Sequence, residues 1–277
     1  MELFSIIIPA NNEADYIDRC LAAVMQQTPA AGPLQIIVVA NACTDTTVAQ
    51  ARAFAPQAAA RGWQLDVLDL EQGGKPGALN AGDAQATGPL RAYLDADIVC
   101  DLALFGALRA ALSATDAPLY ATGKLRVVRA KSPVTRAYAA FWQSLPFVQS
   151  GAVGTGLYAV NAAGRARWNA FPAIITDDTF VRLNFAPQDR IEVAPPYDWP
   201  MIEGFAPLVK VRRRQDAGVH ELAALFPDLM ANAGKAPLGM SGLLSRAAQR
   251  PWGFVVYAAV SVMVRLKRSG NGWTRGR

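Results

Sequence analysis

Two carboxylates one residue apart, Asp95 and Asp97, are the residues of this chain whose spacing most directly implies chemistry. They follow an apolar run that ends at Leu94, a pattern typical of a buried strand that stops at the rim of a sheet. In open α/β sheets, ligands bind at that rim, outside the carboxyl ends of the strands. Carboxylate oxygens suit Mg²⁺ or Mn²⁺, and these ions usually connect protein carboxylates to substrate phosphates. The pair indicates a metal-dependent enzyme that handles a diphosphate, although a strand end before a helix capped by Asp101 fits the same residues.

The elements that must position this pair alternate along the first part of the chain. Helical patterns lie between apolar runs, and this alternation predicts an α/β fold with a mostly parallel sheet and flanking helices. Residues 184–207 are rich in proline and aromatic side chains and predict an irregular segment around a site. The predicted strands are 3–9, 34–40, 64–70, 89–94, 119–128 and 153–160, and the predicted helices are 14–27, 46–60, 76–85, 101–113, 133–149, a helix carrying Arg212 to Arg214, and 221–232.

Size and composition favour one large domain with an appendage. The chain has 277 residues, of which 52% are hydrophobic and 18% charged, which is enough for a real core. We place a catalytic domain at residues 1–235 and a tail at 236–277. Three cysteines without metal-site spacing and a lone histidine, His220, argue against a disulfide framework and a multi-histidine metal site. The opening residues predict a strand rather than a signal peptide, and with reduced thiols this favours the cytoplasm.

The positive charge of the chain lies in the tail. Seven of the 27 basic residues and none of the 22 acidic residues lie between positions 236 and 277, so the rest of the chain has 20 basic and 22 acidic residues. This distribution argues against nucleic acid as a partner, because a nucleic-acid footprint lies on the folded domain. Residues 252–264 are uncharged and too short to span a bilayer. Basic residues flank this run, and Trp252 and Tyr257 could anchor it at an interface. Residues 246–268 therefore predict a helix that contacts an anionic membrane surface at the cytoplasmic face. An ordinary packed helix is the alternative.

Four segments together resemble family 2 glycosyltransferases of the GT-A fold, in the order expected for that family, between residue 4 and about residue 218. They are the strand and turn 5–13, the segment 38–45, the glycine-rich segment 73–82 and the carboxylate pair itself. The third resembles the Lys-x-x-Ala-Leu-Asn signature closely. Its glycines allow close backbone approach and its lysine suits a phosphate. The resemblance implies a Mg²⁺ or Mn²⁺ ion on the diphosphate of a nucleotide-sugar.

The resemblance also implies which residues meet the donor. Relatives often carry an aspartate where Ala40 stands, and Asn41 is the substitute that we expect to contact the base. Asp45 is open to a second interpretation as a helix cap, and so is the turn 10–13. The donor-binding residues expected in this way are Pro9, Ala10, Asn12, Glu13, Asn41, Asp45, Lys75, Asp95, Ala96, Asp97, Arg212 and Arg214, with Asp95 and Asp97 as metal ligands.

Two further segments resemble the acceptor side of the family's site. Gly154, Thr155 and Gly156 are similar to a Gly-Thr/Ser turn beside the acceptor, and Trp199 belongs to the aromatic segment that we expect to shape the acceptor pocket. Residues 176–179 resemble a Thr-Glu-Asp segment whose second acid is the general base in inverting relatives. We therefore expect Asp178 as the base and Asp177 as the alternative base or an orienting residue; acids at a helix N-terminus are the structural alternative.

The expected activity is inverting transfer of one sugar from a nucleotide-sugar, with UDP as the nucleotide, to a hydroxyl of a saccharide or lipid-linked acceptor. Processive relatives carry Gln-x-x-Arg-Trp where this chain has Val211 to Gln215, and only Arg214 is retained, which favours single transfer. A nucleotidyltransferase is an alternative, but it would place a glycine-rich loop directly after the first strand. A non-catalytic nucleotide-sugar-binding protein would be expected to lose some of the acids, and all of them are present.

Overall fold

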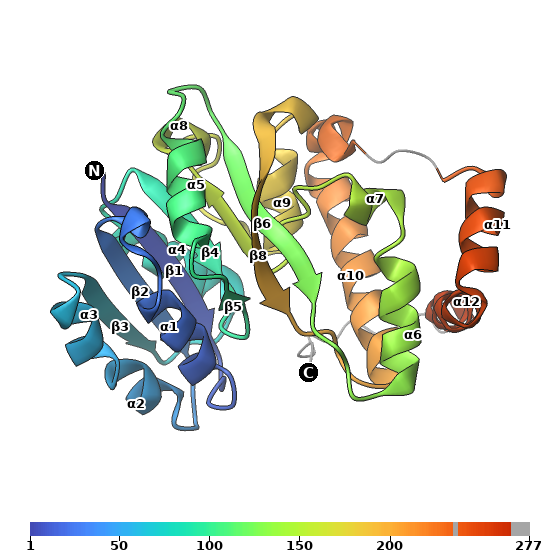
Figure 1. Cartoon of the computed structure of the whole chain (residues 1–277), viewed down its shortest axis with the longest axis horizontal. Helices are drawn as coiled ribbons and strands as arrows, with labels where there is room; N and C mark the ends of the chain where they lie inside the picture. Colours follow the sequence, from blue (N-terminus) through green and yellow to red (C-terminus); the bar gives the residue numbers. More distant parts are fainter. Residues whose placement is uncertain (235–237, 267–277) are drawn as a thin grey trace.

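The computed structural model describes residues 1–234 and 238–266. Its strands and helices alternate as predicted through the first half of the chain (Figure 1). The strands are β1 (Phe4–Ala10), β2 (Leu34–Asn41), β3 (Gln64–Leu70), β4 (Leu90–Leu94), β5 (Val99–Cys100), β6 (Tyr120–Val127), β7 (Leu157–Val160) and β8 (Arg190–Trp199). The helices are α1 (Ile17–Met25), α2 (Thr47–Arg52), α3 (Ala55–Ala60), α4 (Lys75–Gln85), α5 (Leu104–Leu112), α6 (Pro133–Trp142), α7 (Pro146–Gln149), α8 (Ala162–Arg165), α9 (Asp177–Leu183), α10 (Phe205–Leu225), α11 (Met240–Gln249) and α12 (Pro251–Leu266), with short 3₁₀ turns at Pro29–Ala31, Pro187–Asp189 and Pro227–Ala233.

The strands form one sheet in the order β3-β2-β1-β4-β7-β6-β8-β5. Neighbours from β3 to β4 are parallel, as are β6 and β8, whereas β7 runs antiparallel to both β4 and β6, and β5 runs antiparallel to β8. Parallel pairs outnumber antiparallel ones, as predicted, and the sheet is mixed because β7 enters its middle in the opposite direction. The carboxyl ends of β1, β2 and β4 still meet at one edge, as the prediction requires.

Both faces of the sheet are covered, which explains its continuous apolar strands. In β1, Phe4, Ile6 and Ile8 face a core shared with α1 and α5, and Ile7 faces a second core shared with α4 and α9. A third cluster joins α6, α10 and α12, which stand beside the sheet on the side of β8 (Figure 1).

Several predicted elements are interrupted where proline or glycine controls the backbone. The predicted helix 46–60 is two helices, with Pro56 in the first turn of the second. The predicted helix 133–149 likewise divides, because Pro146 begins α7. The predicted strand 153–160 is reduced to β7, since Gly154 and Gly156 adopt positive φ angles of 69° and 76°. The expected separation of two helices at 212–232 is also wrong, because α10 is continuous to Leu225.

The prediction of an irregular segment at 184–207 is wrong for residues 190–199, which form β8. Two adjacent prolines, Pro195 and Pro196, argue against a strand in the sequence. In the sheet they lie at a shift of register between Gly123 and Lys124 of β6, where the strand pairing is broken.

The described part of the tail packs on the domain. Val256 and Val260 of α12 are buried against α6 and α10, and Tyr257 stacks on Tyr138 with ring centroids 5.3 Å apart. Tyr257 therefore faces inward and is not the membrane anchor that we expected. The search of the described residues finds no helix with the length and hydropathy needed to cross a bilayer. The boundary at 235/236 and the basic residues Lys267, Arg268, Arg275 and Arg277 lie outside the described residues.

Candidate active site

Hydrogen bonds from one buried amide connect the loops at the carboxyl edge of the sheet. Asn41, at the end of β2, donates from Nδ2 to the carbonyl of Ala10 at 2.8 Å. Its Oδ1 accepts a hydrogen bond from the backbone N–H of Gly74, the residue before α4, at 3.0 Å. Asn41 is only 3% exposed, and both ends of its amide are used inside the fold. In the structure Asn41 therefore ties the residue before Lys75 to the end of β1, and its predicted contact with the base stays a prediction.

Lys75 joins two acids that are far apart in the sequence. Its Nζ lies 2.8 Å from Oδ1 of Asp95 and 3.1 Å from Oδ1 of Asp177. Burial alone would lower the pKa of Lys75, but the carboxylates of Asp177 and Asp95 outweigh it and raise that pKa above its ordinary value. The ammonium is therefore charged at any physiological pH and brings together the β4 end and the start of α9.

Asp177 and Asp178 are adjacent but held differently. The second oxygen of Asp177, Oδ2, accepts a hydrogen bond from the Tyr158 hydroxyl at 3.3 Å, so Lys75 and Tyr158 hold both oxygens of this carboxylate. Asp178 Oδ1 accepts a hydrogen bond from the backbone N–H of Thr179 at 2.6 Å. Burial and the neighbouring Asp177 raise the pKa of Asp178 to about 6, against the opposing charge of Lys75. Asp178 is thus the acid whose protonation changes near neutral pH.

The Asp95–Asp97 turn offers two carboxylates, the kind of ligand that Mg²⁺ and Mn²⁺ prefer. The backbone N–H of Asp95 donates to the carbonyl of Gly156 at 2.8 Å, which ties the turn to the 154–156 loop. Ala96 and Asp97 are buried, whereas the Asp95 carboxylate is about one third exposed. Within residues 1–234 and 238–266, no three His, Cys, Asp or Glu side chains cluster as a complete metal site. Two protein carboxylates and a diphosphate are a common ligand set for these hard cations, so the donor set fits.

The nucleotide turn predicted at residues 9–13 is held against the loop after β2. Asn12 Oδ1 accepts hydrogen bonds from the backbone N–H groups of Thr44 and Asp45, at 2.6 and 3.3 Å. Asp45 in turn accepts from the backbone N–H groups of Ala14 and Thr47. These bonds, above all those from Thr47, lower the pKa of Asp45 although its slight burial acts in the opposite direction. Asn12 and Asp45 therefore organise this turn, and Asp45 has the capping role left open by the sequence.

The remaining residues of the turn differ in exposure. Pro9 and Ala10 are buried at the end of β1, so they present backbone rather than side chains to a ligand. Glu13 is partly exposed, and its backbone N–H donates to Thr47 Oγ1 at 2.8 Å. A contact of Glu13 with ribose stays a prediction.

The predicted acceptor loop lies next to Trp199 and the metal turn. A Cβ added to Gly156 would lie 2.8 Å from Ile98 and 3.3 Å from the Trp199 ring. The carbonyl of Thr155 accepts a hydrogen bond from the buried Tyr197 hydroxyl at 2.9 Å. Trp199 stacks on Trp142 of α6 with ring centroids 5.6 Å apart. The structure thus brings these predicted acceptor residues together.

The three consecutive arginines of α10 face different neighbours. Arg212 lies 3.2 Å from Asp216, four residues further along α10. Although burial acts in the opposite direction, the nearby Tyr138 and Tyr257 raise the pKa of Arg212. Arg213 donates to the carbonyl of Met263 in α12. The contact of Arg213 holds α10 against α12, and donor binding by Arg212 stays a prediction. Arg214 lies one turn before Gly218, on the helix stripe that packs on the Thr176 segment.

Sequence reasoning missed three residues around the acids: Tyr158, Tyr120 and Arg182. Tyr158 is stacked between Tyr93 and Tyr120 on neighbouring strands, with ring centroids 5.0 and 6.1 Å away. The only signal in the sequence was an aromatic residue in a buried strand, which ordinarily indicates core packing. The pairing of Tyr93 with Tyr158 across β4 and β7 is what directs the Tyr158 hydroxyl to Asp177.

The sequence pattern of "Glycosyl transferase family 2" matches residues 5–166, which is more than half of the chain and includes the metal turn and the acceptor loop. The chain belongs to glycosyl transferase family 2. It has the mixed α/β fold of solved GT-A glycosyltransferases.

The similarity to individual proteins covers only part of the chain or is low in sequence identity. The chain is 39% identical to glycosyltransferase AglE of Haloferax volcanii over 94 residues, which are 34% of this chain and 30% of AglE. The chain thus spans less than a third of that relative. Among solved structures, the mannosyltransferase PcManGT from Pyrobaculum calidifontis, in complex with GDP-Man and Mn²⁺, has a TM-score of 0.59 and 21% identity over 97% of this chain and 76% of that one. TarS of S. aureus in complex with UDP has a TM-score of 0.54 and 15% identity over 96% of this chain and 92% of that one.

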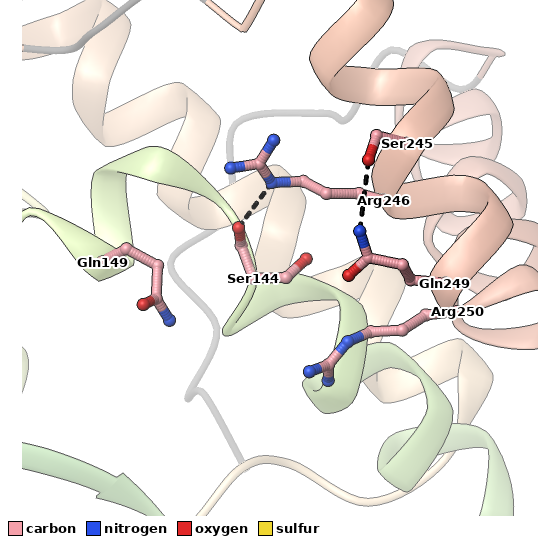
Figure 2. A pocket seen from close by; sticks show the side chains of 6 residues that line it. All are labelled: Ser144, Gln149, Ser245, Arg246, Gln249 and Arg250. Carbon is pink, nitrogen blue, oxygen red and sulfur yellow. Dashed lines mark hydrogen bonds between the residues drawn. The ribbon is translucent and has the colours of Figure 1, made fainter.

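A separate cleft of about 430 Å³ lies between α6–α7 and α11, and none of the predicted family 2 site residues lines it (Figure 2). Arg246 Nε donates to the carbonyl of Ser144 at 2.7 Å, and Arg250 Nη1 donates to the carbonyl of Ala140 at 2.7 Å. Gln149, Ser245 and Gln249 complete the lining. These two arginines of the tail therefore bind the α11–α12 segment to the domain.

Proposed function

We propose that this chain is an inverting glycosyltransferase that transfers one sugar from a UDP-sugar to a hydroxyl of a saccharide or lipid-linked acceptor. The observation that carries the proposal is that the adjacent acids Asp177 and Asp178 differ in their contacts and that the pKa of Asp178 is raised. Lys75 and Tyr158 occupy both oxygens of Asp177, whereas Asp178 has a pKa raised to about 6. A carboxylate with a pKa near the working pH is suited to remove a proton from an attacking hydroxyl.

In the proposed reaction, Asp178 accepts the proton of the acceptor hydroxyl as that oxygen forms a bond to the anomeric carbon. The bond between the anomeric carbon and the diphosphate oxygen breaks on the opposite face, and the nucleoside diphosphate leaves with the bonding electrons. A Mg²⁺ or Mn²⁺ ion bound by Asp95 and Asp97 would supply a Lewis acid that neutralises the diphosphate. Lys75 contacts both Asp177 and Asp95. In the proposal its ammonium also stabilises the charge that develops on the leaving phosphate.

Single transfer rather than polymerisation is part of the proposal. The Gln and Trp positions of the processive motif are Val211 and Gln215 in this chain. Arg214 remains, and it lies on the face of α10 that packs on the Thr176 segment. We assign Arg214 to the diphosphate in the donor-bound state, because a guanidinium forms charge-assisted hydrogen bonds with phosphate.

Peripheral contact with an anionic membrane at the cytoplasmic face is the second part of the proposal. Trp252, Val255, Val262 and Leu266 are more than half exposed and follow helical spacing on the outer side of α12. Met240 and Leu244 extend this apolar surface along α11, at the edge of the molecule farthest from β3 (Figure 1). The exposed Arg265 lies beside it, and no acidic residue occurs after position 235. An apolar face with only positive charges fits an anionic lipid surface.

The experiment for the transfer reaction is a donor panel. The purified chain is incubated with UDP- and GDP-sugars and Mn²⁺, and release of nucleoside diphosphate is measured with and without EDTA. We expect release from a UDP-sugar that EDTA abolishes and that Asp97→Asn reduces by about 10²-fold or more, as for loss of a metal ligand. Nucleotide binding without any release would favour a binding protein, and release of pyrophosphate from a nucleoside triphosphate and a sugar phosphate would favour a nucleotidyltransferase.

A further inference from the structure

Arg182, on α9, is a buried arginine without a hydrogen-bond acceptor. Its side chain is 6% exposed, and no described residue accepts a hydrogen bond from it or forms an ion pair with it. Its guanidinium carbon lies 5.3 Å from the centroid of the Phe147 ring on α7. A guanidinium has five N–H donors, and burying such a group without partners is costly.

The other buried arginine among the described residues, Arg109, has hydrogen-bond acceptors, as buried arginines usually do. Arg109 is also 6% exposed, but it donates to the carbonyls of Ala31, Pro33 and Glu2. It thereby ties the start of the chain to the loop before β2. Arg182 makes no such hydrogen bond to a described residue, although its exposed fraction is the same. Burial lowers the pKa of Arg182, and the neighbouring Tyr120 and Asp178 offset this only in part.

A second unpartnered donor lies beside it. Tyr120, on β6, is fully buried and its hydroxyl has no hydrogen-bond partner among the described residues. The hydroxyl points at the predicted acceptor loop, since a Cβ on Gly154 would lie 1.6 Å from Tyr120 Oη. Tyr120 and Arg182 each lie within electrostatic range of Asp178. Two donors from different elements therefore lie near the proposed base.

The position of Arg182 relative to Asp178 follows from the helix. The two residues are four apart, so they lie on the same face of α9, one turn from each other. An acceptor whose hydroxyl reaches Asp178 can therefore extend along this face of α9 to Arg182. Arginine and tyrosine hydroxyl donors together match the oxygens of a carboxylate or a phosphate.

We propose that Arg182 and Tyr120 form a subsite for an anionic group, a carboxylate or a phosphate, carried by the acceptor. Phe147 covers the guanidinium in the structure and would give way to the anion. That the anion belongs to the acceptor rests on the proposed function. That Arg182 and Tyr120 bind an anion does not depend on it. It narrows the acceptor to a uronic acid, or to a sugar or lipid that carries a phosphate.

The test measures binding and transfer separately. Calorimetric titration with methyl glucuronide, glucose 1-phosphate and the neutral methyl glucoside compares wild type with Arg182→Gln and Tyr120→Phe. We expect wild type to bind at least one of the two anions at least tenfold more tightly than the glucoside, and Arg182→Gln to lose that preference. Which anion binds distinguishes a carboxylate from a phosphate. Arg52→Gln, an exposed arginine on α2, is the control and keeps the preference.

Thermal stability separates this role from a structural one. Because the Tyr120 hydroxyl has no protein partner, Tyr120→Phe should leave the melting temperature unchanged or raised while weakening the binding of the anion. Equal binding of charged and neutral sugars by wild type, or an unchanged preference in Arg182→Gln, would overturn the proposal. Failure of the proposed transfer would appear differently, as anion binding that depends on Arg182 with no release of nucleoside diphosphate.

Discussion

At the scale of residues, Asp178 links activity and stability through one proton. Its pKa is raised to about 6 in the folded protein, above the ordinary 3.8, so the folded state binds this proton more tightly than the unfolded chain. That contribution to stability is complete below about pH 4 and is lost as pH rises through 6. The acidic limb of kcat/KM should accordingly fall with an apparent pKa near 6 rather than near 4.

Asp178→Asn removes the charge that costs stability at neutral pH. We expect the variant to be more stable than wild type at pH 7.5, on the order of 1–2 kcal/mol, and nearly equal to it at pH 4. Melting temperatures of both proteins across this range check the prediction. Asp116→Asn, at an exposed position, should show no such trend. If the difference in melting temperature between Asp178→Asn and wild type did not grow with pH, the raised pKa of Asp178 would be contradicted.

Lys75 sets the proton affinity of its neighbours. Its ammonium opposes the rise in the pKa of Asp178, so Lys75→Met should move the acidic limb of kcat/KM above pH 6 and weaken donor binding. Rate measurements from pH 5 to 8 check the shift, with the exposed Lys124→Met as the control. An unchanged limb would mean that Lys75 does not act on Asp178.

The sequence predicted the acids and Lys75 but not what holds them. Asp95, Lys75 and Asp178 belong to local patterns, and each pattern fits in a few consecutive residues. The contacts of Asp177 with Tyr158 and Lys75 depend on strand pairing across β4 and β7 and on the return of α9 to the sheet. The prediction for Asn41 follows from the alanine at position 40, whereas its hydrogen bonds to Ala10 and Gly74 depend on how three loops meet in the fold.

At the scale of elements, α10 holds the start of α9 through one small residue. A Cβ on Gly218 would lie 2.5 Å from Thr176 Cγ2 and 3.0 Å from Ile175 Cβ, while Glu221 accepts a hydrogen bond from the Ile175 N–H at 3.0 Å. Gly218→Ala should therefore displace the segment that carries Asp177 and Asp178. We expect a loss of about 1–3 kcal/mol in the free energy of unfolding, together with a lower kcat.

Gly239→Ala is the matched control, because nothing lies within 4 Å of a Cβ at that position. Denaturant unfolding and initial rates measure both variants. A Gly218→Ala protein with normal stability and normal kcat would show that α10 does not set the position of the acids.

Strands and helices whose ends are marked by turn or glycine-rich residues in the sequence were predicted well. Strand 64–70 has the predicted bounds, because a turn and a glycine-rich loop flank it. Strand β8 was missed because its two prolines are compatible with a sheet only where β6 changes register, and that register is a property of the pairing, not of either strand. The same holds for β7, whose antiparallel direction follows from the path of the intervening chain.

At the scale of the whole molecule, α12 has two apolar sides. One side packs on α6 and α10, and the other exposes Trp252, Val255 and Val262. Replacing Val255 and Val262 with glutamate together should abolish co-sedimentation with vesicles of phosphatidylglycerol and phosphatidylcholine, without loss of donor hydrolysis. Ala117→Glu, on an exposed loop, is the control. Equal sedimentation of the double variant and wild type, or none by wild type, would contradict membrane contact.

The central claim is that Asp178 serves the transfer step and not donor binding. The most direct measurement compares wild type with Asp178→Asn for two quantities: the Kd of UDP in the presence of Mn²⁺, and the rate of transfer or hydrolysis of a UDP-sugar. We expect the Kd of UDP to stay within about twofold of wild type and the rate to fall about 10²- to 10⁴-fold, as for loss of a general base. An Asp178→Asn enzyme that retains the wild-type rate would contradict it.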